Sequence, residues 1–197
     1  MLNNSLFLCG SLCKDMLHHK LIEDAVVHSV PASLFGSVYR LEVGFPVFCS
    51  EGQDKIQGEL VSIKNTELVW PLLDQFFLYK EEKAEKCLYL RELKKVETDE
   101  GLKDAVVYSL NPTKKPRSAR LIEGGDWLAD FRKQVPITQE LTDEEKHYIK
   151  KLGKCTGRDI VPYTPLTREL EKRGFVVDKG RRPALTKLGK EIFQFLI

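Results

Sequence analysis

The stretch Ser5-Leu6-Phe7-Leu8-Cys9-Gly10-Ser11-Leu12 decides how this chain of 197 residues is interpreted. Its apolar half predicts a short buried strand, and Gly10 predicts that the strand ends in a tight loop. Glycine allows another group to approach the backbone closely. Free N–H groups in such a loop form a nest for a carboxylate or a carbonyl oxygen that is becoming negative. We therefore expect a small polar ligand at residues Cys9, Gly10, Ser11 and Leu12.

Working outward from this stretch, the first 110 residues carry mainly strand patterns. Four β-rich runs follow, at residues 34–41, 56–63, 88–96 and 105–108. A helical stripe covers residues 67–77, and Pro71 within it predicts a late start or a kink. Many strands and few helices predict an α+β fold built on a small, closed or nearly closed mixed β-barrel.

The composition changes after residue 110, where prolines and lysines at positions 111–116 predict a loop or linker. Thr142 and Glu145 have the spacing of a capping box that opens a helix through Leu152. A second helix, a hairpin-like wing and a last helix follow, which is the order of a small winged-helix unit. We predict two domains: a barrel at residues 1–135 and a mostly helical, winged-helix-like unit at residues 136–197.

The overall composition indicates a soluble globular protein, with 42% hydrophobic and 30% charged residues. The five cysteines form no C-x-x-C pair and no Cys/His cluster with zinc-ligand spacing, so we expect free thiols, no metal and no cofactor. The sequence shows no basic leader and no apolar stretch of membrane-spanning length. We therefore expect a cytoplasmic protein that does not associate with membranes.

The first loop resembles the Tyr-Gly-Ser-Leu signature of γ-glutamylcyclotransferase-like proteins, which include the γ-glutamylamine cyclotransferases. Further segments resemble that family in its own order: Gly44–Val47, Ile56–Leu60, Leu73-Asp74, Tyr89–Arg91, Ala105–Tyr108 and Ile122–Trp127. The resemblance covers roughly residues 5–130. It implies the family's barrel, a γ-glutamyl amine or peptide as ligand, and Tyr89 as a further ligand contact beside the loop.

In that family the α-amine of a γ-glutamyl group attacks its own γ-carbonyl, which closes 5-oxoproline and expels an amine. One glutamate of the protein moves the proton. This chain carries Phe77 at the position of that glutamate and Cys9 at that of the signature tyrosine. Glu82 or Glu81 could act as a displaced catalytic group, or both could belong to a solvated charged loop. Asp74 is better suited to a structural role, either bonding backbone N–H groups or pairing with a base such as Arg91.

Two functions therefore remain open: a cyclotransferase with a relocated glutamate, or a binding module that lacks the proton shuttle.

The C-terminal segment is basic, with 13 Lys/Arg against 8 Asp/Glu over residues 141–197. Its candidate contacts to phosphates are Arg168, Lys172, Arg173, Lys179, Arg181 and Arg182. Acidic residues interrupt this set, so we do not expect nucleic acid as a partner. A packing or dimerisation module is favoured, which leaves a homodimer open.

Overall fold

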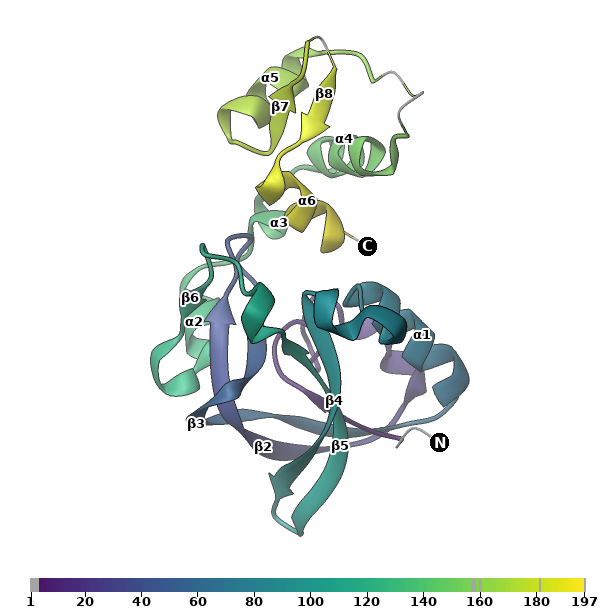
Figure 1. Cartoon of the computed structure of the whole chain (residues 1–197), viewed down its shortest axis with the longest axis vertical. Helices are drawn as coiled ribbons and strands as arrows, with labels where there is room; N and C mark the ends of the chain where they lie inside the picture. The colour runs from purple at the N-terminus through teal and green to yellow at the C-terminus, as the bar shows by residue number, and fades with distance from the viewer. Residues whose placement is uncertain (1–3, 157–158, 160, 181, 197) are drawn as a thin grey trace. The chain divides into compact units, whose positions relative to one another are not determined.

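The computed structural model describes residues 4–156, 159, 161–180 and 182–196 (Figure 1). The chain divides into two compact units. The first comprises the chain up to Leu41 together with Phe45–Gln134, and the second comprises Glu42–Gly44 together with the chain from Val135 onward.

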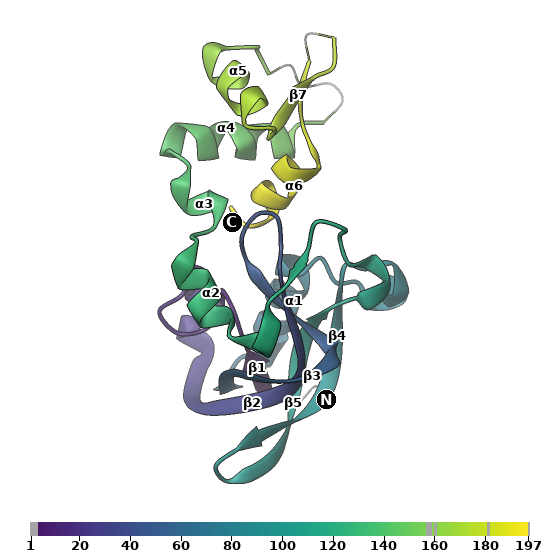
Figure 2. The same cartoon turned by 90° about the vertical axis from the view of Figure 1, so that its left-hand side faces the viewer.

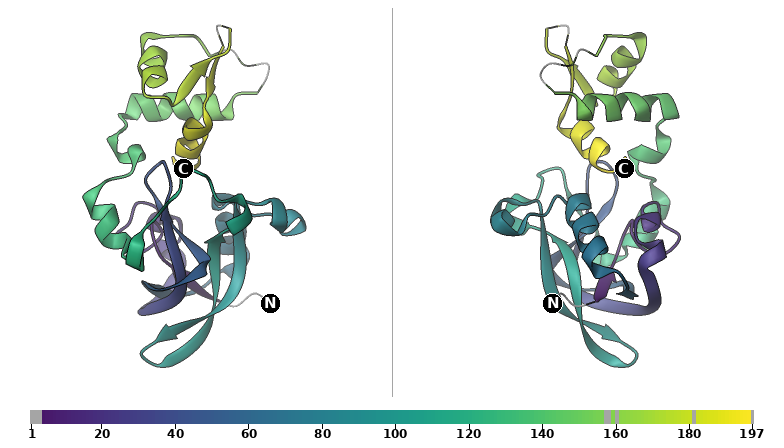
Figure 3. Two further views of the ribbon diagram at one scale, coloured as in Figure 1. Left: turned by 60° about the vertical axis from the view of Figure 1, so that its left-hand side comes forward. Right: turned by 90° about the vertical axis from the view of Figure 1, so that its right-hand side faces the viewer.

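The first unit is built on one strongly curled sheet (Figure 3). Its strands are β1 (Ser5–Leu8), β2 (Val26–Arg40), β3 (Pro46–Ile63), β4 (Tyr89–Thr98), β5 (Gly101–Leu110) and β6 (Arg120–Leu121). They lie in the order β3-β1-β5-β4-β2-β6, and β2 pairs with β3 as well, so the sheet curls back on itself. The β1–β5 pair is parallel and the neighbouring β1–β3 and β4–β5 pairs are antiparallel. The mixed sheet and the helices confirm the α+β class.

Strands β2 and β3 are much longer than the runs that the sequence indicates. Both extend beyond those runs without a regular apolar alternation: residues 26–31 of β2 are mostly exposed and pair with residues 59–63 of β3, and the polar residues 54–55 of β3 pair with Gly36 and Phe35. Gly58 allows β3 to cross β1 closely, because a Cβ atom there would lie 2.2 Å from the carbonyl oxygen of Leu8. The pairing of β2 with β3 and the close approach of Gly58 to Leu8 together account for the curl of the sheet.

Helix α1 (Thr66–Phe76) packs against the curled sheet with Val69, Trp70, Leu73 and Phe76 buried. It begins at Thr66, so the late start that Pro71 predicted is wrong. Pro71 is exposed and removes only one N–H donor from the helix. The helix stays continuous because the apolar residues on both sides of Pro71 are buried. The short helices of this unit are η1 (His19–Leu21), η2 (Glu23–Ala25), η3 (Glu81–Lys86), η4 (Pro112–Lys114), η5 (Glu123–Gly125) and α2 (Trp127–Lys133).

The second unit contains helices and a hairpin (Figure 2). Its elements are α3 (Ile137–Glu140), α4 (Asp143–Lys154), α5 (Pro165–Lys172), β7 (Val176–Asp178), β8 (Pro183–Leu185) and α6 (Lys187–Gln194). The capping box predicted at Thr142 is present, since its hydroxyl accepts from the N–H of Glu145 and the Glu145 carboxylate accepts from the N–H of Thr142. The predicted order of helix, helix, hairpin and helix is observed from Thr142 onward. Arg181 lies outside the described residues.

Candidate functional site

The loop after β1 turns at Gly10, which has φ +93°, a conformation that side chains other than glycine rarely adopt. A Cβ atom at this position would also lie 2.9 Å from the carbonyl oxygen of Pro46. The turn is closed by the N–H of Cys13, which donates to the carbonyl of Gly10 at 3.2 Å. Backbone conformation and close packing both require glycine here, as the sequence predicted for a tight loop.

Hydrogen-bond acceptors of this loop are occupied while its donors are open. The carbonyl of Ser11 accepts from the N–H of His18 at 2.9 Å, and the carbonyl of Leu12 lies 3.0 Å from Nδ1 of His19. Among the described residues, no hydrogen bond engages the N–H groups of Ser11 and Leu12. Ser11 and Leu12 are 9% and 4% exposed, so a ligand oxygen bound by these donors would be shielded from water.

Polar groups beside the loop are held neutral or already paired. Burial raises the pKa of the Cys9 thiol to about 12, so this thiol is protonated at neutral pH and is a poor nucleophile. The carboxylate of Glu59 accepts from the N–H of Lys14 at 3.2 Å and from the hydroxyl of Ser29 at 3.1 Å. Cys9 can therefore line a ligand site, and Glu59 is held by its own partners.

Phe77 lies at the end of α1 within a cluster of aromatic rings. It stacks on Tyr108, with centroids 4.4 Å apart and planes 11° apart, and meets the ring of Tyr89 edge-on at 5.2 Å. Tyr89 itself is only 1% exposed. The position where a proton-transferring glutamate was expected is thus an apolar aromatic wall.

This aromatic cluster continues to the ligand loop through His18. The ring of His18 lies 5.1 Å from that of Phe76, which in turn lies 5.0 Å from that of Phe77. Because the N–H of His18 donates to the carbonyl of Ser11, the loop and the aromatic wall are linked by direct contacts.

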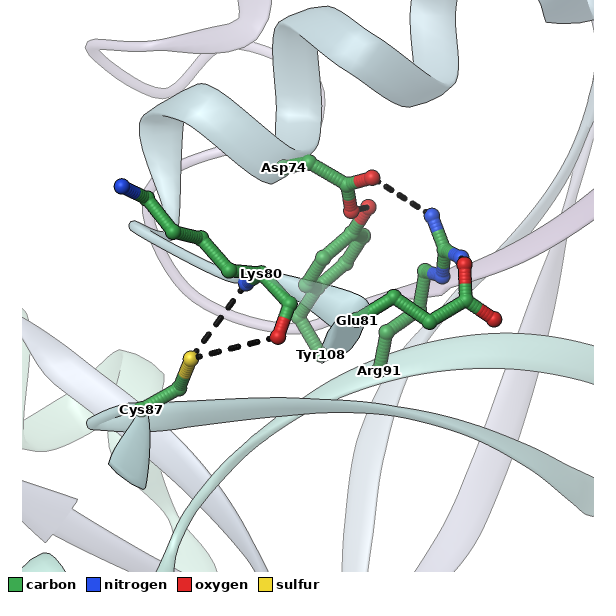
Figure 4. A network of polar contacts seen from close by, with 6 residues as sticks. All are labelled: Asp74, Lys80, Glu81, Cys87, Arg91 and Tyr108. Carbon is green, nitrogen blue, oxygen red and sulfur yellow. Dashed lines mark hydrogen bonds and ion pairs between the residues drawn. The ribbon is translucent and has the colours of Figure 1, made fainter. Parts of the chain in front are cut away.

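Tyr108, on which Phe77 stacks, belongs to a polar network that centres on Asp74 (Figure 4). Its carboxylate accepts from Nη1 of Arg91 at 2.6 Å and from the phenol of Tyr108 at 2.6 Å. This confirms the pairing of Asp74 with Arg91 that the sequence suggested. Burial and the hydrogen bond to Asp74 both raise the pKa of Tyr108, and the charge of Asp74 raises the pKa of Arg91 against the opposing effect of burial.

The two glutamates proposed as displaced catalysts lie in η3. Glu81 reaches Arg91, with Oε2 at 3.4 Å from Nη2, but its side chain is 79% exposed. Glu82 is exposed as well. Figure 4 shows Cys87 beside this segment, where its thiol accepts from the N–H of Lys80 at 3.3 Å. In the described part of the chain, no hydrogen bond or ion pair joins either glutamate to the loop.

Tyr108 and His18 are candidate site residues that the sequence did not single out. The register of β4 and β5 places Tyr108 directly opposite Arg91. The sequence indicated a strand around each of these two residues. It could not indicate that the two strands pair with Arg91 opposite Tyr108, because a strand pattern does not specify register. Over the described residues, no group of three or more His, Cys, Asp and Glu side chains could hold a metal ion, and no helix is long and apolar enough to cross a membrane.

Comparison with known proteins gives the following matches. The profile described as gamma-glutamyl cyclotransferase, AIG2-like, matches residues 6–129. YkqA from Bacillus subtilis is 26% identical with a TM-score of 0.50, and the match covers 72% of this chain and 44% of YkqA. An AIG2-like protein from Mus musculus is 18% identical with a TM-score of 0.43, covering 60% of this chain and 83% of that protein.

This chain thus spans less than half the length of YkqA. No curated protein sequence matched the chain. The profile covers more than half of the chain and includes β1, its loop, α1 and the strands that carry Arg91 and Tyr108. The chain belongs to the gamma-glutamyl cyclotransferase, AIG2-like family.

Proposed function

We propose that this chain binds a γ-glutamyl amine or peptide at the Cys9–Leu12 loop and holds it without cyclising it. The observation that carries the proposal is the place of Phe77. Its ring stacks on Tyr108 and packs on Tyr89, where the family pattern has a glutamate. An aromatic wall can shape a pocket for a ligand, but it cannot transfer a proton.

Binding is supported by the open donors of the loop. The γ-glutamyl group presents a carboxylate and a γ-carbonyl, and both are acceptors that suit the N–H groups of Ser11 and Leu12. Backbone hydrogen bonds from Cys13 to Gly10 and from His18 to Ser11 hold the loop before ligand arrives, which lowers the entropy lost on binding.

The absence of turnover follows from the chemistry of cyclisation. When the α-amine attacks the γ-carbonyl, the nitrogen must lose a proton and the leaving amine must gain one. A positioned side chain that does both typically contributes about 10²–10⁴-fold to the rate. Asp74 is an unsuitable replacement, because Arg91 and Tyr108 already occupy its carboxylate.

A cyclotransferase that uses Glu81 or Glu82 is the second candidate. It is favoured by the 3.4 Å contact of Glu81 with Arg91, which places one carboxylate next to the network that centres on Asp74. If the chain turns over γ-glutamyl amines, Glu81→Gln or Glu82→Gln should lower kcat by about 10²-fold or more and leave binding nearly unchanged.

We further propose that the protein is cytoplasmic and that its partner is a small molecule.

Its second unit, with the helix–helix–hairpin–helix order of a winged helix, would serve packing or homodimerisation and not sequence-specific DNA reading. Ion pairs of Lys172 with Glu169 and of Arg173 with Glu145 occupy part of the basic face. Mobility-shift or anisotropy assays test this. Affinity for one DNA sequence far above the nonspecific level at physiological salt would refute it.

The ligand claim is tested by calorimetric titration of γ-glutamyl dipeptides and γ-glutamyl-lysine into the full chain. Ser11→Asp places a negative charge at the loop and should abolish binding. Ser11→Asn has the same shape without the charge and should retain much of it. Circular dichroism and thermal melting confirm that both variants fold. Binding that is equal in both variants would exclude the loop as the site.

A further inference from the structure

A hollow of about 500 Å³ lies in the second unit, at the end of helix α4. It is lined by His147, Lys150, Lys151, Lys154, Cys155, Asp159 and Val161. Pockets that hold small molecules are typically about 300–1,000 Å³, so this hollow has the size of a binding site for one.

Helical spacing brings its basic residues together. His147, Lys150, Lys151 and Lys154 stand at positions i, i+3, i+4 and i+7 of α4, which lie on one face of a helix. Each of them lines the hollow, so four basic side chains from one helix face border the same space. Val161 is buried and gives this space an apolar wall.

The described lining holds three lysines and one acidic residue, so its charge balance is positive. Among the described residues, no ion pair involves Lys150, Lys151 or Lys154. The single acidic residue of the lining, Asp159, is committed elsewhere, because its carboxylate accepts from the N–H of Thr156 at 2.6 Å and from the Thr156 hydroxyl at 2.9 Å. These hydrogen bonds, the backbone one first, lower the pKa of Asp159, so its carboxylate stays charged and offsets only one of the three lysine charges of the lining.

A simpler role for the lysines is to interact with the negative end of the α4 dipole. That effect reaches only the last turn of a helix, which contains Lys151 and Lys154. It does not account for Lys150 and His147 lining the same hollow one turn earlier. An anion in the hollow would interact with all four groups.

We propose that this hollow is a binding site for a small phosphorylated metabolite, distinct from the γ-glutamyl site and independent of its function. Lysine ammonium groups bind phosphate oxygens as point charges, and charge-assisted hydrogen bonds are the strong ones. The lining suits a ligand with one or two phosphate groups toward the lysines and a less polar part against Val161. A hollow of about 500 Å³ has the volume of a compact anion, so we infer a small molecule and not the phosphate backbone of a long polymer.

The test titrates inorganic pyrophosphate and adenosine monophosphate into the full chain by calorimetry at two salt concentrations. We expect binding that weakens as salt rises. Lys150→Gln combined with Lys154→Gln should lower the affinity by about tenfold or more, because each removes a charged donor from the lining. The matched control is Lys146→Gln, on the same helix, whose ammonium group pairs with Asp143 and does not line the hollow. It should change the affinity by less than about twofold.

Melting temperatures of the variants show that they fold, and backbone amide shifts in a nuclear magnetic resonance titration locate the site. Perturbations in α4 that saturate with pyrophosphate agree with the proposal. Four outcomes overturn it: no binding by the wild type, equal losses in the control, shifts confined to other elements, or tighter binding of a short DNA duplex than of either small anion.

Discussion

Phe77 lies face to face with Tyr108, with ring centroids 4.4 Å apart and planes 11° apart, where the family pattern has a catalytic glutamate. Tyr108 is itself hydrogen-bonded to Asp74, whose carboxylate is paired with Arg91. The stacked pair of Phe77 and Tyr108 is therefore held by a polar network through the Tyr108 hydroxyl.

Phe77→Glu should introduce 5-oxoproline release from γ-glutamyl dipeptides, because it restores a carboxyl group at the position of the missing shuttle. Phe77→Gln is the matched control. It has nearly the same shape and cannot accept a proton at neutral pH, so it should release none. Chromatography of the products measures both. A folded Phe77→Glu variant that binds ligand and gives no product would mean that more than the shuttle has been lost.

Asp74→Asn should destabilise the first unit more than Asp104→Asn does. The first change leaves the charge of Arg91 without its main partner, and the side chain of Arg91 is only 10% exposed. Breaking a partly buried pair in this way is expected to cost about 1–3 kcal/mol in the free energy of unfolding. The Lys95–Asp104 pair, 66% and 52% exposed, should contribute about 0–1 kcal/mol. Urea denaturation compares the two, and equal costs would contradict a structural role for Asp74.

The stability contributed by Tyr108 should disappear at alkaline pH. Burial and the hydrogen bond to Asp74 raise its pKa in the folded state above the ordinary 10.0. The folded state therefore holds this proton more tightly than the unfolded state does. Its contribution is fully present below pH 10 and falls as pH rises above it, by about 1.4 kcal/mol per pH unit.

Denaturation of wild type and Tyr108→Phe between pH 8 and pH 11 isolates this effect. The advantage of the wild type should shrink steadily above pH 10. Absorbance of the phenolate in the folded proteins should show equal numbers of tyrosines ionising near pH 10 in the two proteins, although the wild type has one tyrosine more. A pH-independent difference between the two proteins would mean that Tyr108 titrates as an ordinary exposed tyrosine.

Gly10→Ala should disturb the ligand loop through two causes that a control variant can separate. The backbone has φ +93°, and the added Cβ would also lie 2.9 Å from the Pro46 carbonyl. Gly101 has φ +107° with nothing within 4 Å of a Cβ, so Gly101→Ala carries the backbone strain alone. That strain costs about 1–3 kcal/mol. Thermal melting should show a larger loss for Gly10→Ala, and only this variant should lose ligand affinity. Equal losses of stability would indicate that close packing at Pro46 is unimportant.

The sequence predicted those features that depend on neighbouring residues. The strand that ends at Gly10, the capping box of Thr142 and the order of the elements after it all follow from local patterns, and all are observed. The pairing of Asp74 with Arg91 was one of the two structural roles expected for this carboxylate, and it is observed.

The features that the sequence did not predict depend on register and packing. The pairing of Arg91 with Tyr108 across β4 and β5, and the position of Phe77 against both tyrosines, arise only when distant strands meet. The extensions of β2 over residues 26–31 and of β3 over residues 51–55 have no regular apolar alternation, so the sequence did not predict that they are strands. The late helix start predicted from Pro71 was wrong because proline is disfavoured within a helix by itself, whereas burial of the apolar stripe of α1 outweighs the loss of one hydrogen bond.

The central claim is that the site binds a γ-glutamyl compound and does not cyclise it. One experiment on the wild-type chain tests both halves: calorimetric titration with γ-glutamyl dipeptides and γ-glutamyl-lysine, followed by measurement of 5-oxoproline in the same samples after prolonged incubation. We predict saturable binding of at least one of these compounds, with no 5-oxoproline above the protein-free control. Product formed catalytically, at many turnovers per chain, would contradict the account and favour a relocated glutamate, and the absence of binding to every compound would contradict the ligand site itself.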